Sequence, residues 1–340
     1  MPRLVILAPN WLGDAVMALP AIADVRRGLT AAHITVAARA AVVPLFQLVA
    51  DVDDTIVLGR GASLARVGSW GQMGAELRNH GFATALLLPN SIHAALLAYR
   101  AGIRERWGYG GGVRAQWLTR AVPRIRGGHQ ADYYRHLVAA LGFSNGDREP
   151  RISVPEPMRA AAEQLLRDAG WNGSTPLVAL APGAAYGGAK RWPPERFGEL
   201  AARLAADGVA AVLIGSAADS AAAAEVAAAF RSHAGSAAAP HDLTGRTDLP
   251  ALAGVLQRCR ALVTNDSGAM HLAAAAGVPV TAVFGPTNEK ATHPIGADHA
   301  VVVHPVWCRP CMLRECPIDH RCMRGIDVGT VVDHARRLIR

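Results

Sequence analysis

Strand-like and helix-like segments alternate in two series along this chain of 340 residues, and a polar, proline-broken stretch at residues 144–156 separates the series. Each short apolar run leads into a longer helical pattern, which is typical of βαβ units. Such units build a parallel sheet with helices on both faces, so we predict an α/β fold of two doubly wound domains. The expected strands are 4–9, 34–38, 55–59, 83–89, 177–183, 210–216, 261–266 and 280–285.

Helices are expected between these strands. The Gly/Arg-rich stretch at 105–128 is instead predicted to be a long loop. The expected helices are 15–29, 42–50, 70–80, 91–101, 129–142, 157–169, 194–207, 219–231, 249–259, 268–276 and the amphipathic segment 328–340.

The composition indicates a well-packed protein. Apolar residues make up 51% of the chain and charged residues only 18%, which permits a large core and excludes wholesale disorder. No window approaches the ~18 uninterrupted apolar residues of a membrane-spanning helix. The N-terminus also lacks the layout of a secretory signal, so we expect a cytoplasmic protein.

The net charge of +8 comes almost wholly from arginine, because Lys190 and Lys290 are the only lysines. A basic surface suits an anionic partner, or it is merely a solvated face. No nucleic-acid module accompanies the arginines. The candidates for contact with an anionic partner are Arg104, Arg106 and Arg114.

Polar residues follow the expected strands, where open α/β sheets bind ligands. In the second series, Asp266 or Ser267 can cap the next helix, and Gly268 lets a group approach its backbone closely. A helix N-terminus of this kind also suits an anion such as phosphate. A flexible, exposed Gly-rich loop brings Lys190 and Arg191 after an earlier strand, without P-loop or dinucleotide-binding glycine spacing.

Five segments together resemble the bacterial heptosyltransferases of glycosyltransferase family 9, and most closely the heptosyltransferase II branch, over essentially the whole chain. They are APNWLGDAVMALPAI, APGAAYGGAKRWPPERF, LTGRTDLPALAGVL, TNDSGAMHLAAAAGVPVTAVFGPTNEKATHPIG and CRPCMLRECPIDHRCM.

The resemblance implies a GT-B architecture with two Rossmann-like domains facing across a cleft. It implies metal-independent, inverting transfer of heptose from ADP-L-glycero-β-D-manno-heptose to the lipopolysaccharide inner core (heptosyl-Kdo2-lipid A) of a Gram-negative bacterium. The enzyme would contact the cytoplasmic face of the membrane peripherally. The expected parts are an acceptor domain (1–155), a linker helix (156–175), a nucleotide-sugar domain (176–325) and a terminal helix (326–340) that returns toward the first domain.

The resemblance also implies roles for individual residues. Asp14 is the expected base, with a helix N-cap as its alternative. Lys190 is expected to neutralise the diphosphate of the departing ADP. Turn or helix-packing roles remain alternatives for several of the others. The expected donor contacts are Gly183, Lys190, Arg191, Gly215, Ser216, Thr244, Gly245, Asp266, Ser267, Gly268 and His271, and the further acceptor contacts are Asn10 and Gly13.

Other functions remain open. One is family 9 transfer to a different heptosyl or protein acceptor. A nucleotide-sugar epimerase of similar fold is disfavoured by the motifs. A non-catalytic anionic-glycolipid binding protein is disfavoured because both Asp14 and Lys190 are present.

Four of the five cysteines lie within 15 residues, and Cys259 stands apart. Their spacing, C-x₂-C-x₄-C-x₅-C, suits a structural Zn²⁺ or iron site, with His304 or His320 as substitute ligands. The alternative is a loop of reduced thiols. We expect any such metal to lie far from the transfer chemistry. The candidate ligands are Cys308, Cys311, Cys316 and Cys322.

Overall fold

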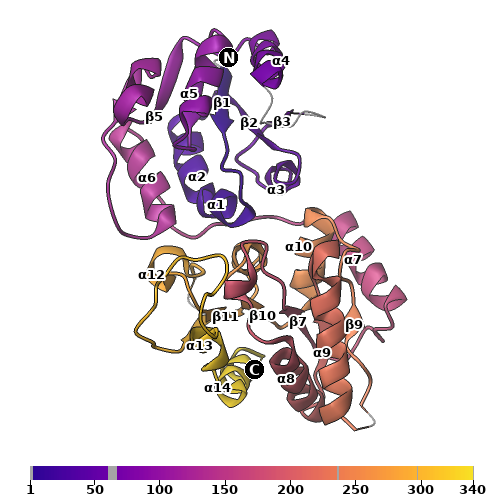
Figure 1. Cartoon of the computed structure of the whole chain (residues 1–340). Coiled ribbons are helices and arrows are strands. Elements are labelled where there is room, and N and C mark those ends of the chain that lie inside the picture. The colour runs from indigo at the N-terminus through magenta and orange to yellow at the C-terminus, as the bar shows by residue number, and fades with distance from the viewer. Residues whose placement is uncertain (1–2, 60–66, 236, 297, 340) are drawn as a thin grey trace. The chain divides into compact units, whose positions relative to one another are not determined.

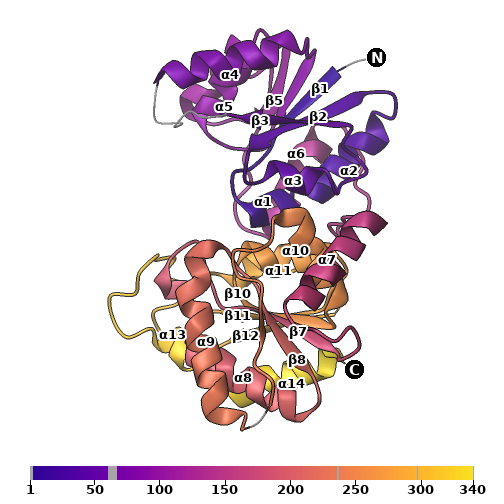
Figure 2. The ribbon, with the colours of Figure 1, turned by 90° about the vertical axis from the view of Figure 1, so that its right-hand side faces the viewer.

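The computed structural model describes residues 3–59, 67–235, 237–296 and 298–339. The chain divides into two units, Met1–Ser153 and Val154–Arg340. Each unit holds one six-stranded sheet whose paired strands all run parallel, with helices on both faces (Figures 1 and 2). The predicted α/β class and the two doubly wound sheets are therefore confirmed.

The first sheet has the strand order β3-β2-β1-β4-β5-β6. Helices α4 and α5 pack together, as do α2 and α6, and the two pairs cover opposite faces (Figure 2). The strands are β1 (Arg3–Leu7), β2 (His33–Arg39), β3 (Asp54–Leu58), β4 (Thr84–Leu87), β5 (Glu105–Tyr109) and β6 (Arg120–Val122). The helices are α1 (Leu12–Met17), α2 (Leu19–Gly28), α3 (Val43–Phe46), α4 (Val67–Asn79), α5 (Ile92–Arg100), the 3₁₀ helix η1 (Gly112–Trp117) and α6 (Gln130–Ala140).

The second sheet repeats this plan with the order β12-β11-β10-β7-β8-β9. Every residue of β7, β10 and β11 is buried, because helices cover both faces. The strands are β7 (Leu177–Ala181), β8 (Ala210–Leu213), β9 (His241–Asp242), β10 (Ala261–Asn265), β11 (Val280–Phe284) and β12 (His299–Val303). The helices are α7 (Glu156–Asp168), η2 (Gly188–Lys190), α8 (Pro194–Ala206), η3 (Ala217–Asp219), α9 (Ser220–His233), α10 (Leu249–Arg258), α11 (Gly268–Ala275), α12 (Glu289–Thr292), α13 (Arg321–Arg324) and α14 (Val328–Ile339).

The stretch 105–128 is not the long loop that we expected. It holds β5, η1 and β6, which extend the first sheet to its edge. Gly108 interrupts the apolar pattern of β5, so the strand is hard to recognise in the sequence. The fold favours a glycine at this position because β4 lies close by. A Cβ at Gly108 would lie 3.1 Å from the carbonyl oxygen of Leu87 on β4.

Helices α7 and α14 both belong to the second unit. Helix α7 packs against α10. Helix α14 packs against α8, and Val331 and Val332 are buried in the core of the second unit. The apolar face of α14 is therefore covered within the second unit, and the return of this helix toward the first domain stays a prediction.

Candidate active site

The strand order reverses between β7 and β10, and Asn265 joins the ends of these two strands. Asn265 is fully buried. Its Nδ2 donates to the carbonyl oxygens of Pro182 (2.8 Å) and Gly183 (3.2 Å), and its Oδ1 accepts from the backbone N–H of Trp192 (2.9 Å). Asn265 thus holds the chain on both sides of the Lys190 loop, which we define as residues 184–191. The sequence analysis assigned it no role.

Lys190 and Asp266 form a shielded ion pair at this edge. The Lys190 Nζ lies 2.6 Å from Oδ2 of Asp266, and the two side chains are 12% and 7% exposed. Thr287, which sequence reasoning missed, donates its hydroxyl to the same oxygen over 2.6 Å. The ammonium has three donors, so it retains capacity for an anionic ligand.

This pairing bears on the role expected for Asp266. In the structure Asp266 is the counter-ion of Lys190, and its carboxylate would repel a diphosphate. The contact of Asp266 with the donor stays a prediction. The hydroxyl of Ser267 lies 3.1 Å from that of Thr264, and Ser267 caps α11 without a hydrogen bond from its side chain. The backbone N–H groups that open α11, beginning at Gly268, are the remaining seat for an anion.

Asp219 lies beside Ser216 and Gly183, two of the expected donor contacts. Its Oδ2 accepts from the backbone N–H (2.9 Å) and the hydroxyl (2.7 Å) of Ser216, which forms a capping box. A Cβ at Gly183 would overlap the Asp219 carboxylate, which explains the glycine. The Arg191 guanidinium lies 3.9 Å from Oδ1 of Asp219. Ser216 therefore has a local structural role, and Asp219 is the acidic group that sequence reasoning missed.

The remaining predicted donor contacts follow the same sheet edge. Gly245 has a φ of +73° and donates its N–H to the carbonyl oxygen of Gly215 over 2.9 Å, so these two residues lie side by side. Among the described residues, nothing hydrogen-bonds to the buried Oγ1 of Thr244. His271 is 5% exposed and faces the interior from α11.

Asp14 lies at the corresponding edge of the first sheet, in the helix that follows β1. It is the third residue of α1 and half-buried, whereas the N-cap position is taken by Trp11. The capping alternative for Asp14 is therefore wrong. Burial, and then the charge of Asp14, raise the pKa of the Tyr134 hydroxyl, so this phenol remains protonated beside the carboxylate. Gly13 precedes Asp14 in α1, and Asn10 is exposed.

The three arginines proposed for acceptor binding do not form one surface. Arg114 is 3% exposed, and it donates to the carbonyl oxygens of Tyr109 and Pro89. Burial, and then the charge of Arg124, lower the pKa of Arg114 to about 10. Arg114 is therefore a structural residue of the first unit.

Arg104 and Arg106 lie at the amino end of β5. Because β1, β4 and β5 run parallel, this is the edge of the sheet opposite to Asp14. A five-residue strand puts roughly 15 Å between the two edges. Arg106 is moreover bound to the carbonyl oxygens of Trp117 and Ile103, so only Arg104 has an exposed and uncommitted position among the three.

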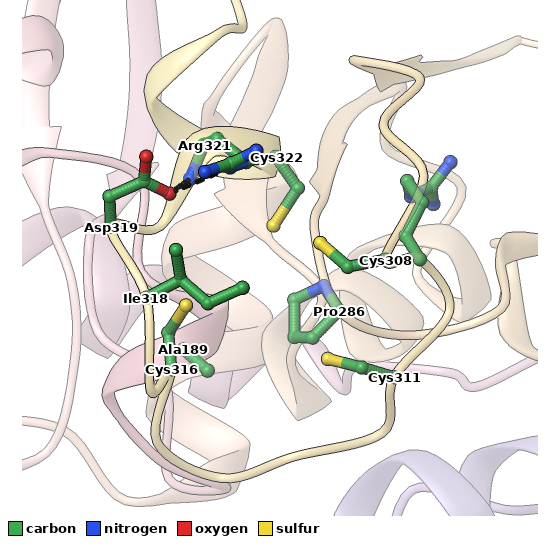
Figure 3. Close-up of a pocket in the computed structure, with 10 residues that line it drawn as sticks. Ala189, Pro286, Cys308, Cys311, Cys316, Ile318, Asp319, Arg321 and Cys322 are labelled. Carbon is green, nitrogen blue, oxygen red and sulfur yellow. Dashed lines mark hydrogen bonds and ion pairs between the residues drawn. The ribbon is translucent and has the colours of Figure 1, made fainter.

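Four cysteines line one small cavity of about 20 Å³ in the second unit (Figure 3). We expected the cluster to lie far from the donor site. Ala189, next to Lys190, lines the same cavity, so the cluster instead lies close to the Lys190 loop. Among the described residues, no three His, Cys, Asp or Glu side chains are already arranged to hold a metal ion. The four-cysteine cluster consists of Cys308, Cys311, Cys316 and Cys322, all present as free thiols.

Two doubly wound units of this topology are typical of the GT-B fold. The structure of an ADP-heptose lipopolysaccharide heptosyltransferase II from E. coli is similar to this chain with a TM-score of 0.83 and 28% identity, over 100% of this chain and 98% of that one. A family 9 glycosyl transferase structure from Veillonella parvula matches with a TM-score of 0.87 and 23% identity, over 99% and 97%.

The chain belongs to glycosyltransferase family 9 (heptosyltransferase), whose model matches residues 70–321. It is 30% identical over 308 residues to lipopolysaccharide heptosyltransferase 2 of Salmonella typhimurium, which covers 88% of this chain and 87% of that protein. Within the described residues, no helix has the length and apolar character needed to cross a membrane.

Proposed function

We propose that this chain is an inverting heptosyltransferase that moves heptose from ADP-L-glycero-β-D-manno-heptose to the lipopolysaccharide inner core, heptosyl-Kdo2-lipid A. The proposal is supported by relatives from Salmonella typhimurium and E. coli that are named lipopolysaccharide heptosyltransferase 2. The observation that carries it is the shielded Lys190–Asp266 pair where the strand order of the second sheet reverses.

In this proposal the second unit binds the donor. The Lys190 ammonium and the first-turn N–H groups of α11, from Gly268 onward, face the diphosphate. Lys190 thus stabilises the charge that develops on ADP as it leaves. Arg191, Gly183 and the residues near Asp219 contact the remainder of the nucleotide.

The first unit binds the acceptor. The acceptor hydroxyl oxygen attacks the anomeric carbon from the face opposite to ADP, the bond from carbon to diphosphate oxygen breaks, and the configuration inverts. Asp14 takes the hydroxyl proton. Asn10 and Gly13 flank this base. The acceptor is a glycolipid, so the enzyme works at the cytoplasmic face of the membrane as a peripheral protein.

The test is transfer with purified protein, ADP-heptose and heptosyl-Kdo2-lipid A. We expect the acceptor to gain the mass of one heptose, with one ADP released per transfer. Kdo2-lipid A, which lacks the first heptose, is the matched control and should be a much poorer acceptor. Transfer to Kdo2-lipid A alone, or to a protein alone, would replace this acceptor assignment by another family 9 activity.

A further inference from the structure

We propose that the four-cysteine cluster binds one thiolate-preferring metal ion, Zn²⁺ or iron, and that this ion holds the cysteine-rich segment against the Lys190 loop. The cysteine-rich segment is defined as residues 304–322. The proposal rests on the proposed function only for the catalytic meaning of Lys190, since the ion and the contact with the loop stand on their own observations.

The thiols have the spacing that a metal site needs, and all four line one cavity. Figure 3 shows the sulfur atoms of Cys308 and Cys322 directed toward each other, with Cys311 and Cys316 lining other sides of the same cavity. Cys308 and Cys311 supply a C-x₂-C pair, and the backbone N–H of His320 donates to Sγ of Cys316 over 3.3 Å. An ion would draw the sulfur atoms to about 2.3 Å from itself, which requires side-chain rotation because the thiols are not yet in a coordinating arrangement.

Most of the cysteine-rich segment lacks regular secondary structure and has little apolar burial. Between β12 and α13, residues 304–320 lie in neither helix nor strand. Four large apolar side chains of this stretch are about half exposed or more, so burial provides little stabilisation. Fixing the backbone costs about 1–2 kcal/mol per residue, and metal–thiolate bonds can offset such a cost. These exposed residues are Trp307 (78%), Met312 (53%), Leu313 (45%) and Ile318 (48%).

Despite this, the segment binds the Lys190 loop at three points. The backbone N–H of Ala189 donates to the carbonyl oxygen of Arg314 over 2.9 Å, and that of Gly188 donates to Oε1 of Glu315 over 3.0 Å. The Tyr186 hydroxyl donates to the carbonyl oxygen of Met312 over 2.8 Å. The Tyr186 ring lies 4.7 Å from the Lys190 ammonium, which ties the segment to the proposed catalytic cation.

Arg309, between the first two cysteines, fixes the other side of the ion pair. Its Nε donates to the carbonyl oxygen of Gly285 over 2.9 Å, and its Nη2 donates to that of Thr287 over 3.2 Å. Thr287 in turn donates to Asp266. The segment therefore contacts the supports of both Lys190 and Asp266, and an ion that orders it would order the pair.

The first experiment measures metal in full-length protein purified without a histidine tag. Elemental analysis should find about one Zn or Fe per chain, and visible thiolate-to-iron absorption distinguishes the two. Cys308→Ser with Cys311→Ser should lose the metal. Cys259→Ser is the matched control and should keep the metal, because Cys259 does not line the four-cysteine cavity. Metal-free wild-type protein that takes up neither Zn²⁺ nor Fe²⁺ would overturn the site.

The second experiment removes the ion from wild-type protein with a chelator and follows hydrogen exchange of the amides. The amides of Gly188 and Ala189 should exchange at least about tenfold faster, and added metal should restore their protection. Amides of α2 in the first unit are the control and should not change. Unchanged exchange at Gly188 and Ala189 would overturn the coupling.

Neither experiment contains a heptose donor or acceptor. Failure of the transfer assay would therefore leave both results standing, and absence of metal would leave heptosyl transfer untouched. The chelator arm also decides the matter if the double cysteine variant fails to fold.

Discussion

The ammonium of Lys190 lies 2.6 Å from the Asp266 carboxylate, and both side chains are largely shielded from water. The pair joins a loop that follows β7 to the residue that follows β10, so it closes the point where the second sheet reverses its strand order. Its two members have opposite charges. In the proposed reaction Lys190 attracts the anionic leaving group, whereas Asp266 repels it. Mutations at the two positions should therefore differ in their effects.

Lys190→Ala should lower transfer by about 10²–10³-fold, because it removes a charge that acts on the departing diphosphate. It should also destabilise the protein by up to about 3–5 kcal/mol, since the Asp266 carboxylate loses its counter-ion. The sequence predicts an exposed loop at Lys190, whereas both side chains of the pair are shielded in the structure. Lys290→Ala, at an exposed position of α12, is the control. Turnover and urea denaturation measure the two effects, and normal turnover in Lys190→Ala would remove it from the mechanism.

Asp266→Asn should leave ADP affinity unchanged or raise it, because the variant removes a negative charge from beside the diphosphate site. The amide oxygen can still accept from Thr287, so the local fold should survive. Calorimetric titration with ADP checks this prediction at low and moderate salt. Binding weakened tenfold or more in folded Asp266→Asn protein would instead indicate that the carboxylate contributes directly to nucleotide binding.

Asp14→Asn should abolish most transfer and leave ADP binding unchanged, since an amide cannot take the acceptor proton. The loss of stability should stay within about 1 kcal/mol, because Asp14 lies in the first turn of α1 but does not cap it. Asp54→Asn, at an exposed position of the same unit, is the matched control. An unfolded Asp14→Asn variant, or one with full activity, would contradict the assignment.

Arg104 and Arg114 should respond differently to charge reversal. Arg114→Glu buries a carboxylate where a guanidinium now binds two carbonyl oxygens, so we expect loss of folded protein. Arg104→Glu should fold normally. If Arg104 contacts the anionic acceptor, Arg104→Glu should raise the KM for the acceptor and leave the KM for ADP-heptose unchanged. Thermal unfolding and substrate titrations separate these outcomes, and a stable Arg114→Glu variant would refute the structural role.

Cys259 should be the least reactive thiol. Burial raises the pKa of the Cys259 thiol to about 12, and the thiol donates to the carbonyl oxygen of Val255 over 3.3 Å. A raised pKa means that the thiol stays protonated, and hence a poor nucleophile, at pH 8. Alkylation of native, chelator-treated protein should label exposed Cys311 well before Cys259, as peptide mass analysis can show. Equal labelling rates would contradict this order.

The amino-acid sequence by itself determined the class of fold. Apolar residues that recur every two residues indicate a strand, and those that recur about every 3.6 residues indicate a helix. This information is local in the sequence. It sufficed for β7, β10 and β11, which are buried throughout and mostly apolar. It failed for β5 and for β12 at 299–303, because a strand near the sheet edge carries charged or half-exposed residues that read as loop.

Only the tertiary structure decided what each polar residue does. Lys190, Asp266 and Thr287 are far apart along the chain. Lys190 and Thr287 both bind Oδ2 of Asp266 only because parallel strands bring their ends to one edge of the sheet. The role of Arg114 likewise depends on its partners, because its guanidinium binds the carbonyl oxygens of Tyr109 and Pro89. The contact between the cysteine-rich segment and the Lys190 loop is also a tertiary contact. Sequence patterns report which side chains leave water, whereas partners and distances arise from contacts between segments that no local pattern encodes.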